Sequence, residues 1–590
     1  MSALRVKRRM ATKVNNFNWK IGGEAGYGIL SAGEIFAYAC SHGGLESFAY
    51  LEYPSLIRGG HNTYQVWVRE DNVQSHSAKI DLLVALNKET IERYVAELKP
   101  EGGLVYDSDD KTLREYACAT RQKNCFAIPM EELAKQAGGE KIMRNMIAVA
   151  ASLGLVGYSF DYLTTLIERV FSRKGAKMVE LNQAAAKLGY AYAVEHYREA
   201  FDYKLEVRPM RDKRMLINGN EAIAMAAIKA GLKFYAAYPM TPASSILHYL
   251  AAQEREYKIV VKQTEDEIAA MNMAVGAAYT GVRSMVATSG GGFSLMAEAL
   301  GMAGMVEAGV VVVLGQRPGP ATGLPTWTEQ GDLRFALHAA QGDFPRLVLA
   351  PGDPEECFEL TFHALNIADQ FQLPVIVMTD KYLAEARQTI PFFNTDKLKV
   401  ERGGWAHTSS LPTDGRFNRY ADTPTGVSPR SIPGQAGGMF AANSDEHDDT
   451  GMADEEASVR IAQMDKRMRK LQFAKVAVPE PVKFYGPKEA DVTLVSWGSM
   501  KGPILEAMKE LAAQGKSVNF IQVRLLEPFP VKELDVVLRQ AKRRVLVENN
   551  YSGQLGGLIR EKTGIDITEK LLKYDGRPVH PEEIVAYVNR

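Results

Sequence analysis

Cysteine is scarce in this sequence, and its spacing excludes one kind of redox centre. The 590 residues contain four cysteines, Cys40, Cys118, Cys125 and Cys357, and no two of them stand in a C-x-x-C pattern. A ferredoxin-like iron–sulfur cluster is held by closely spaced cysteine thiolates. The chain is therefore not expected to carry electrons onward by itself.

The sequence also lacks an excess of charge and a long apolar run. Lys and Arg total 70 against 71 for Asp and Glu, so no global field favours nucleic acid. No apolar run approaches the roughly 20 residues of a membrane span, and the N-terminus has no signal-peptide core. The basic residues of segment 5–13 are typical of a short solvated tail, with organellar targeting as the alternative. We expect a cytoplasmic protein.

Strands that run into helices are what the sequence contains instead, and its length predicts three or four domains. The apolar run Phe234–Tyr238 leads into Tyr-Pro-Met-Thr-Pro-Ala-Ser-Ser, where Thr241-Pro242 is predicted to be the N-cap and first residue of a helix. The run Ile259–Lys262 repeats this pattern before Gln263–Glu267. Parallel strands bring their C-terminal ends to one edge of a sheet, and ligands of α/β sheets bind there.

Glu267 at this edge has two interpretations. It opens the apolar helix 268–277, and a shielded carboxyl group keeps its proton near neutral pH. Thiamine diphosphate chemistry needs such a group, because a hydrogen bond from it drives the aminopyrimidine to its imino tautomer. The alternative is a capping box, in which the Glu267 side chain only bonds back to the Thr264 amide. The motifs that follow favour the thiamine interpretation.

Two further strands end in loops suited to a ligand. Segment 283–296 reads as a strand, the glycine turn Gly290–Gly292 and a helix start, where backbone amides approach a ligand closely. The run Ala308–Leu314 is typical of a strand buried on both faces, and it ends in the Gly- and Pro-rich loop 315–323. Arg317 in this loop is suited to a bidentate grip on a carboxylate, with a solvated loop cation as the alternative.

Together these motifs resemble the α subunit of the 2-oxoacid:ferredoxin oxidoreductases, the family that includes pyruvate and 2-oxoglutarate synthases. Residues 238–245 correspond to the family signature YPITPSS, with Met240 in place of isoleucine and Ala243 where the first serine usually stands. Gly291 stands where many members have proline. Further family blocks follow in the same order and at similar spacing: 264–277, 287–294 and 316–326.

The resemblance implies a role for each motif. Glu267 would activate thiamine diphosphate, while Thr241, Arg317 and Thr322 would hold the carboxylate and keto group of the substrate. Contacts with the cofactor are expected from a further set: Tyr238, Pro239, Gly290 and Gly291. The implied fold is α/β, with a thiamine-enzyme pyrimidine-type parallel sheet domain at 206–387.

The resemblance extends upstream to a γ-type α/β domain, residues 1–205, fused ahead of the α part. Segments Ile21–Gly33 and Tyr53–Thr63 carry this resemblance. By its residues alone Gly22–Gly33 is a weak nucleotide-loop candidate, because the spacing is not G-x-G-x-x-G, and a tight structural turn is favoured. The resemblance implies that this domain helps to form a coenzyme A pocket. Its candidate residues are Ser55, Arg58, His61 and Asn62.

A partner chain is expected because one thiamine motif is missing. The sequence has no Gly-Asp-Gly with a downstream Asn pair, and both Gly331-Asp332-Leu333 and Gly342-Asp343-Phe344 lack the final glycine. In the family, a smaller β subunit supplies the diphosphate site with its Mg²⁺ and one 4Fe–4S cluster. The resemblance therefore implies a shared cofactor, ferredoxin as the acceptor and an (αβ)2 assembly. No metal site is expected in this chain, and no nucleic-acid or membrane partner.

The remaining residues form two regions. Residues 388–475 have few periodic segments and are predicted to be a connector; a metal site at Asp445–Asp449 is disfavoured because neighbouring loop residues point in divergent directions. Residues 476–590 resemble the C-terminal domain of the transketolase-like fold, where Glu548-Asn549-Asn550 is either an interface turn or a helix cap. The predicted strands there are Val492–Ser496, Val518–Val523 and Arg544–Glu548, and the predicted helices are Gly502–Gln514 and Val531–Gln540.

The predicted activity is the coenzyme A-dependent oxidative decarboxylation of a 2-oxoacid, foremost 2-oxoglutarate to succinyl-CoA, with reduction of ferredoxin, or the reverse carboxylation. Pyruvate or a branched 2-oxoacid is the alternative substrate. A non-redox thiamine enzyme and a non-catalytic scaffold on the same fold are the competing functions. Unchanged turnover after Glu267→Gln would contradict the role of that glutamate.

Overall fold

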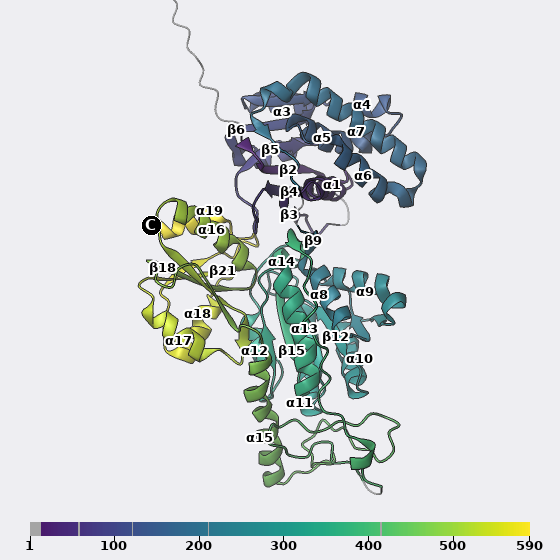
Figure 1. Cartoon of the computed structure of the whole chain (residues 1–590), viewed down its shortest axis with the longest axis vertical. Coiled ribbons are helices and arrows are strands. Elements are labelled where there is room, and N and C mark those ends of the chain that lie inside the picture. The colour runs from purple at the N-terminus through teal and green to yellow at the C-terminus, as the bar shows by residue number, and fades with distance from the viewer. Residues whose placement is uncertain (1–12, 57–58, 121, 210–211, 414–415) are drawn as a thin grey trace, which may run out of the picture. The chain divides into compact units, whose positions relative to one another are not determined.

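The computed structural model describes residues 13–56, 59–120, 122–209, 212–413 and 416–590. The chain divides into two compact units. Unit 1 holds the described residues up to 217 with 386–392 and 580–582, and unit 2 holds 218–385, 393–579 and 583–590. Strands and helices alternate in both units around sheets with parallel strands, which confirms the predicted multidomain α/β class (Figure 1).

Unit 1 is built on an eight-stranded sheet with the order β7-β6-β5-β2-β4-β3-β16-β9. Its strands are β2 (Asn16–Glu24), β3 (Glu46–Glu52), β4 (His61–Arg69), β5 (Ile80–Ala85), β6 (Leu98–Asp107), β7 (Asn124–Ile128), β9 (Arg214–Asn218) and β16 (Arg387–Pro391). Strands β2, β5, β6 and β7 are parallel, and β4 is antiparallel to β2. A separate two-stranded sheet pairs β1 (Lys13–Val14) with β8 (Tyr203–Lys204).

Helices cover both faces of this sheet, as alternate residues of β5 indicate. Leu82 and Val84 join the core under α1 (Ile29–His42), α5 (Arg144–Leu155), α6 (Phe160–Phe171) and α7 (Ala176–Tyr197). Leu83 and Ala85 join the core under α2 (Lys88–Tyr94) and α3 (Lys111–Ala119). The remaining helix is α4 (Met130–Gln136). The β5 sequence is apolar throughout because both of its faces are buried.

The glycine-rich segment after β2 is a structural turn, as its spacing favoured. Gly26 and Gly28 have φ angles of 96° and 71°, in the left-handed region that glycine adopts without strain. Gly33 lies inside α1, where a Cβ atom would stand 2.1 Å from Tyr64 Cγ. The glycines of this segment therefore serve the turn and the close packing of α1 on the sheet.

Unit 2 contains a seven-stranded sheet with the order β11-β10-β12-β13-β15-β14-β20. Its strands are β10 (Phe234–Ala237), β11 (Val260–Gln263), β12 (Ser284–Thr288), β13 (Val310–Gln316), β14 (Leu347–Leu349), β15 (Val375–Asp380) and β20 (Leu525–Glu527). The first six strands in that order are parallel, and β20 is antiparallel to β14. Its helices are α8 (Gly219–Lys229), α9 (Ser244–Tyr257), α10 (Glu267–Tyr279), α11 (Gly290–Met305), α12 (Leu333–His338), α13 (Pro354–Phe371) and α14 (Lys381–Glu385).

The C-terminal part of unit 2 has a second sheet, of order β17-β19-β18-β21-β22. Its strands are β17 (Val482–Tyr485), β18 (Val492–Trp497), β19 (Val518–Val523), β21 (Arg544–Glu548) and β22 (Glu569–Leu572), and its helices are α16 (Lys501–Ala513), α17 (Val531–Gln540), α18 (Gln554–Thr563) and α19 (Pro581–Val588). The predicted strands and helices are confirmed to within two residues at every end. Trp497 and Val523 join the same apolar core as Val312 of β13.

Glu548 and its neighbours cap a helix inside unit 2, which was one of the two predicted roles. The Glu548 carboxylate accepts hydrogen bonds from the backbone amides of Leu555 and Gly556 in α18. The Asn550 amide donates to the Gln330 carbonyl at 3.1 Å and so connects this turn to the loop before α12.

The connector region is irregular over most of its length but ends in the helix α15 (Ala457–Ala474). Lys466 and Lys470 on this helix form buried ion pairs with Glu307, which precedes β13. Glu446 is held by Arg467, and His447 Nδ1 lies 3.0 Å from the Asp448 carbonyl. The acidic island therefore has structural partners, and no group of three potential metal ligands occurs among the described residues.

The start of the predicted connector is not irregular, because its first residues belong to β16, which pairs antiparallel with β3 in the sheet of unit 1. Residues 206–217 also belong to unit 1. The bounds of the four domains given above remain predictions. Within the described ranges, no helix is both long and apolar enough to cross a membrane.

Candidate active site

One edge of the seven-stranded sheet gathers most of the predicted site residues. Strands β10, β11, β12 and β13 are parallel, so their C-terminal ends lie together at this edge. The turn 238–243 follows β10, Glu267 follows β11, Gly290 follows β12 and Arg317 follows β13. The topology thus assembles residues that are up to about 80 positions apart in the sequence.

Glu267 is the first residue of α10, and the alternative interpretation, a capping box with Thr264, is wrong. The N-cap is Asp266, whose carboxylate accepts a hydrogen bond from the Ala269 amide at 2.8 Å. Thr264 instead donates its hydroxyl to the Asp266 carbonyl at 2.7 Å. Because Asp266 caps the helix, the Glu267 side chain is free for another role.

The Glu267 carboxyl group is buried at the sheet edge. The residue is only 3% exposed, and its Oε1 atom has no hydrogen-bond partner among the described residues. Burying an unpaired carboxyl oxygen is costly, so such an atom needs an explanation. The position is suited to a group that hydrogen-bonds a ligand.

The first turn of α11 is shaped around this carboxyl group. A Cβ atom on Gly292 would lie 2.6 Å from Glu267 Oε1 and 2.1 Å from Thr288 Oγ1. A Cβ atom on Gly290 would lie 2.5 Å from Asp332 Oδ2, whereas one on Gly291 would meet nothing within 4 Å. The predicted glycine turn is therefore the start of a helix that two acidic side chains approach closely, and Gly291 borders open space.

Arg317 lies directly after β13 and contacts the turn that follows β10. Its Nη1 donates to the Thr241 carbonyl at 2.9 Å. Burial lowers the pKa of Arg317, while the charges of Asp332 and Glu267 act against that shift. The guanidinium is therefore half-buried and near two carboxyl groups, which argues against a solvated loop cation.

The turn after β10 differs from its prediction. Helix α9 begins at Ser244 with Ala243 at its N-cap, so Thr241-Pro242 is not the helix start, and the peptide bond between them is cis. Thr241 and Pro239 are half-buried, and Tyr238 is exposed. The Ser289 hydroxyl lies 2.7 Å from the Met240 sulfur, which links this turn to the end of β12.

Thr322 is exposed on the loop after Arg317, so it is not brought into the buried part of the site. Thr326 further along this loop is buried, and its hydroxyl has no hydrogen-bond partner among the described residues. Sequence reasoning missed Thr326 because burial in a loop depends on tertiary packing; on this loop Gly576 lies close to the neighbouring residues Leu324 and Trp327.

Two acidic residues on the segment between the Arg317 loop and α12 were also missed. Burial raises the pKa of Glu329 to about 7, with a further contribution from the Asp332 charge. Burial raises the pKa of Asp332 to about 6, against the opposing effect of Arg317. The signal for them in the sequence is the dipeptide Gly331-Asp332, which lacks the final glycine of the thiamine motif.

The predicted coenzyme A residues lie in unit 1. His61 and Asn62 open β4 and pair with Glu24 and Gly23 at the C-terminal end of β2. His61 is buried, burial lowers its pKa to about 4 despite the opposing charge of Glu89, and neither ring nitrogen has a hydrogen-bond partner among the described residues. Ser55 is exposed, and Arg58 lies outside the described residues.

A cavity of about 270 Å³ opens at the same edge of the unit 1 sheet. Gly26 and Tyr27 after β2, Lys141 and the first residues of α5 line it. Arg144 there forms a buried ion pair with Asp107 at 3.1 Å. Lys141 Nζ there lies 3.1 Å from Glu131 Oε2, so both cations of this lining are paired with carboxylates and the lining does not by itself favour an anionic group.

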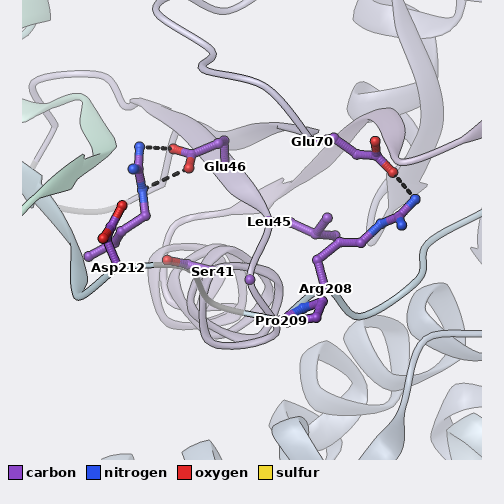
Figure 2. A pocket seen from close by; sticks show the side chains of 9 residues that line it. Ser41, Leu45, Glu46, Glu70, Arg208, Pro209 and Asp212 are labelled. Carbon is purple, nitrogen blue, oxygen red and sulfur yellow. Dashed lines mark hydrogen bonds and ion pairs between the residues drawn. The ribbon is translucent and has the colours of Figure 1, made fainter.

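A second cavity in unit 1, of about 370 Å³, has its charges paired (Figure 2). Arg208 forms an ion pair with Glu70, and Arg214 Nε lies 2.7 Å from Glu46 Oε1. Because both arginines are paired with glutamates, this cavity does not favour an anionic ligand.

Family models match three parts of the chain. Residues 225–466 match the model described as "Pyruvate flavodoxin/ferredoxin oxidoreductase, thiamine diP-bdg", and residues 18–192 match "Pyruvate ferredoxin/flavodoxin oxidoreductase". Residues 486–564 match "Transketolase, C-terminal domain". The thiamine-binding model covers Glu267, Arg317 and the glycine turn.

Two curated relatives and one solved structure match over nearly the whole chain. The chain is 35% identical to the 2-oxoacid:ferredoxin oxidoreductase subunit alpha of Saccharolobus solfataricus, over 96% of each chain. It is 29% identical to the 2-oxoglutarate oxidoreductase subunit KorA of Mycobacterium tuberculosis, over 98% of this chain and 91% of the relative. The structure is a 2-oxoglutarate:ferredoxin oxidoreductase from Magnetococcus marinus with 2-oxoglutarate, coenzyme A and succinyl-CoA bound, at 33% identity and TM-score 0.89 over 98% of this chain and 99% of that chain.

Proposed function

The chain belongs to the α subunits of the 2-oxoacid:ferredoxin oxidoreductases, and on this premise we propose that it oxidatively decarboxylates 2-oxoglutarate to succinyl-CoA together with a partner subunit. Two electrons pass to ferredoxin and carbon dioxide leaves, or the reaction runs in reverse. The choice of 2-oxoglutarate is supported by the names of the M. tuberculosis relative and of the M. marinus structure. Pyruvate and branched 2-oxoacids are the alternatives within the family.

The observation that carries the proposal is the buried, unpartnered carboxyl oxygen of Glu267 at the sheet edge. Thiamine diphosphate, when bound, supplies a carbon nucleophile and an electron sink for decarboxylation. Glu267 would hold a proton at its carboxyl group and hydrogen-bond the pyrimidine. The residues fit this role, because Gly292 leaves room beside Glu267 that any side chain would fill. Tyr238, Pro239, Gly290 and Gly291 are proposed to contact the cofactor.

Arg317 is proposed to orient the carboxylate of the substrate. A guanidinium binds a carboxylate through two parallel hydrogen bonds. It can therefore orient the carboxylate without transferring a proton to it. Its Nη1 bond to the Thr241 carbonyl fixes its direction at the edge. Thr241 remains a proposed substrate contact, and Thr322 requires the exposed loop to move inward or a ligand to reach it.

A β subunit is proposed to complete the site. It would supply the diphosphate site with Mg²⁺ and a 4Fe–4S cluster, because the sequence lacks both the Gly-Asp-Gly motif and the C-x-x-C spacing. Ferredoxin would accept the electrons from this cluster. An (αβ)2 assembly in the cytoplasm remains our expectation.

Coenzyme A is proposed to bind at the β2 and β4 edge of unit 1. The M. marinus structure contains coenzyme A, which supports this co-substrate. The cavity lined by Lys141 and Arg144 opens at this edge, and His61 and Asn62 lie at the same sheet edge. Ser55 and Arg58 remain predictions.

The test is anaerobic reduction of a viologen dye by this chain co-purified with its partner. We expect reduction that needs thiamine diphosphate, coenzyme A and the partner, and that is faster with 2-oxoglutarate than with pyruvate. Faster reduction with pyruvate would change the substrate and leave the reaction class intact. No reduction with any 2-oxoacid, despite bound thiamine and an intact cluster, would favour a non-redox thiamine enzyme.

A further inference from the structure

Glu329 and Asp332 form an acidic pair that the proposed reaction has not used, and Asp332 is the member that lies near Arg317. Both lie on the segment between the Arg317 loop and α12. Asp332 Oδ2 is buried without a hydrogen-bond partner among the described residues, and it packs closely over Gly290 at the start of α11. The Asp332 amide donates to Gln316 Oε1 at 3.0 Å, which fixes the residue next to the end of β13.

Arg317 is near carboxyl groups but forms no ion pair with a carboxylate among the described residues. Among the described residues, no carboxylate oxygen lies within the 4.0 Å of an ion pair with Arg317, although Asp332 and Glu267 both act on its pKa. A guanidinium that is attracted by carboxylates beyond hydrogen-bond distance still has N–H donors available for a ligand. Arg317 is therefore prepared to receive a carboxylate from a ligand.

The region carries more potential negative charge than positive. The carboxyl groups of Glu267 and Asp332 both act on the Arg317 guanidinium, and the Asp332 charge in turn acts on Glu329. The pKa of Glu329 is raised to about 7 and that of Asp332 to about 6, in both cases first by burial. Groups that interact in this way titrate as a pair, so near neutral pH the pair holds a fraction of a proton.

Other charged groups on the surrounding elements have partners of their own. Asp380 accepts from Thr328 at 3.1 Å, and Glu548 accepts from Trp497 at 3.1 Å. Arg334 pairs with Glu561 at 2.6 Å, and Arg577 lies over the Trp327 ring. Asp332 differs from these groups, because its Oδ2 has no hydrogen-bond partner among the described residues, and burial raises the pKa of both Asp332 and Glu329.

We propose, on the basis of the proposed function, that the Glu329–Asp332 pair takes up one proton from solvent when the carboxylate of a 2-oxoacid binds to Arg317. The proton forms an O–H bond on one carboxyl group of the pair, and it returns to solvent when the carboxylate dissociates or is lost as carbon dioxide. Glu329 and Asp332 thereby act as positioning residues that match the charge of the site to an anionic substrate. Binding of the 2-oxoacid is coupled to protons even though the substrate itself stays ionised.

The sign of the coupling follows from electrostatics. A bound anion favours the neutral form of a nearby carboxyl group and so raises its pKa. Binding is then strongest where the pair is already protonated, and it weakens as pH rises. Uptake of one whole proton makes the apparent Kd rise about ten-fold per pH unit.

The first measurement is KM for 2-oxoglutarate between pH 6 and 8.5, with the αβ complex and the viologen assay. We expect the KM of the parent complex to rise about 3- to 10-fold from pH 7 to 8, with less change in kcat. In Glu329→Gln the rise should fall below about 2-fold, because the pair can no longer exchange its proton in this range. Asp332→Asn should also flatten the profile.

Asp343→Asn is the matched control, because Asp343 is the exposed aspartate of the other Gly-Asp dipeptide. It should keep the pH profile of the parent. Equal profiles in the parent, Glu329→Gln and Asp332→Asn would overturn the inference while leaving the proposed function intact. An αβ complex inactive with every 2-oxoacid would overturn the proposed function and this inference with it.

A second measurement does not depend on any variant. N-oxalylglycine, an unreactive isostere of 2-oxoglutarate, is titrated calorimetrically into the thiamine-loaded parent complex at pH 7.5 in phosphate and in Tris buffer. If a proton is taken up, the two heats differ in proportion to the ionisation enthalpies of the buffers. Equal heats in both buffers would overturn the inference.

Discussion

Buried charged groups lie at both ends of strand β13. They form ion pairs at the N-terminal end, whereas those at the C-terminal end form none among the described residues. At the N-terminal end, Glu307 is buried and paired with Lys466 and Lys470 of α15. Burial alone would raise the pKa of Glu307, but the two lysines hold it well below its usual range. At the C-terminal end, Arg317 has no ion pair among the described residues, and Glu267 Oε1 and Asp332 Oδ2 have no hydrogen-bond partner there.

This difference separates a structural cluster from a functional one. Buried charges that are paired with each other hold segments together, and here they attach the connector helix to the sheet. Buried polar atoms without partners cost stability, so they are retained where a ligand supplies the missing partner. The comparison predicts that changes at one end affect turnover and that changes at the other affect folding.

Glu267→Gln should give the largest effect. Loss of the proton-holding carboxyl group should lower kcat about 10²- to 10⁴-fold, while the complex stays assembled. The viologen assay measures this change, and Glu265→Gln, at an exposed position two residues earlier, is the control expected to keep full activity. Unchanged turnover in Glu267→Gln would end the assignment of this end of β13 as the active site.

Glu307→Gln should leave kcat of the folded complex unchanged but destabilise it. Two buried lysines would lose their counter-charge, at a cost of about 3–5 kcal/mol in the free energy of unfolding. Because the pKa of Glu307 is lowered in the folded protein, the parent should lose this stabilisation as pH falls below about 4.5, and the variant should not.

Urea unfolding followed by tryptophan fluorescence measures this destabilisation. Glu298→Gln on the exposed face of α11 is the control, expected to change stability by about 0.5 kcal/mol or less. A Glu307→Gln variant as stable as that control would contradict the structural role of the cluster.

Arg317→Lys and Arg317→Gln test whether the C-terminal end of β13 binds the substrate, through their effect on KM for the 2-oxoacid. Losing a charge-assisted pair costs about 1.5–3 kcal/mol, so KM for the 2-oxoacid should rise about 10- to 100-fold in Arg317→Gln. Arg317→Lys keeps the charge but not the two-pronged geometry, so a smaller rise is expected. Steady-state kinetics at fixed coenzyme A measure both, and equal KM values in all three forms would remove Arg317 from the substrate site.

Local sequence predicted the regular elements well. Strand β19 and helix α17 have the predicted bounds, because apolar periodicity and flanking turns are local signals. Helix starts were less predictable: Thr264 and Asp266 are both good N-caps, and Asp266 takes the role while Glu267 turns into the core. Strand β16 was missed because its pairing partner, β3, lies more than 300 residues away in the sequence.

The sequence by itself determined the α/β class, the motifs at the strand ends and the absence of a cluster motif, because these depend on residue type and short-range spacing. Only the tertiary structure decided which charged groups are paired. Burial and hydrogen-bond partners come from segments far apart in the chain, as when Asp332 closes over Gly290 or α15 reaches Glu307. The acidic pair of Glu329 and Asp332 therefore became visible only once the sheet edge was assembled.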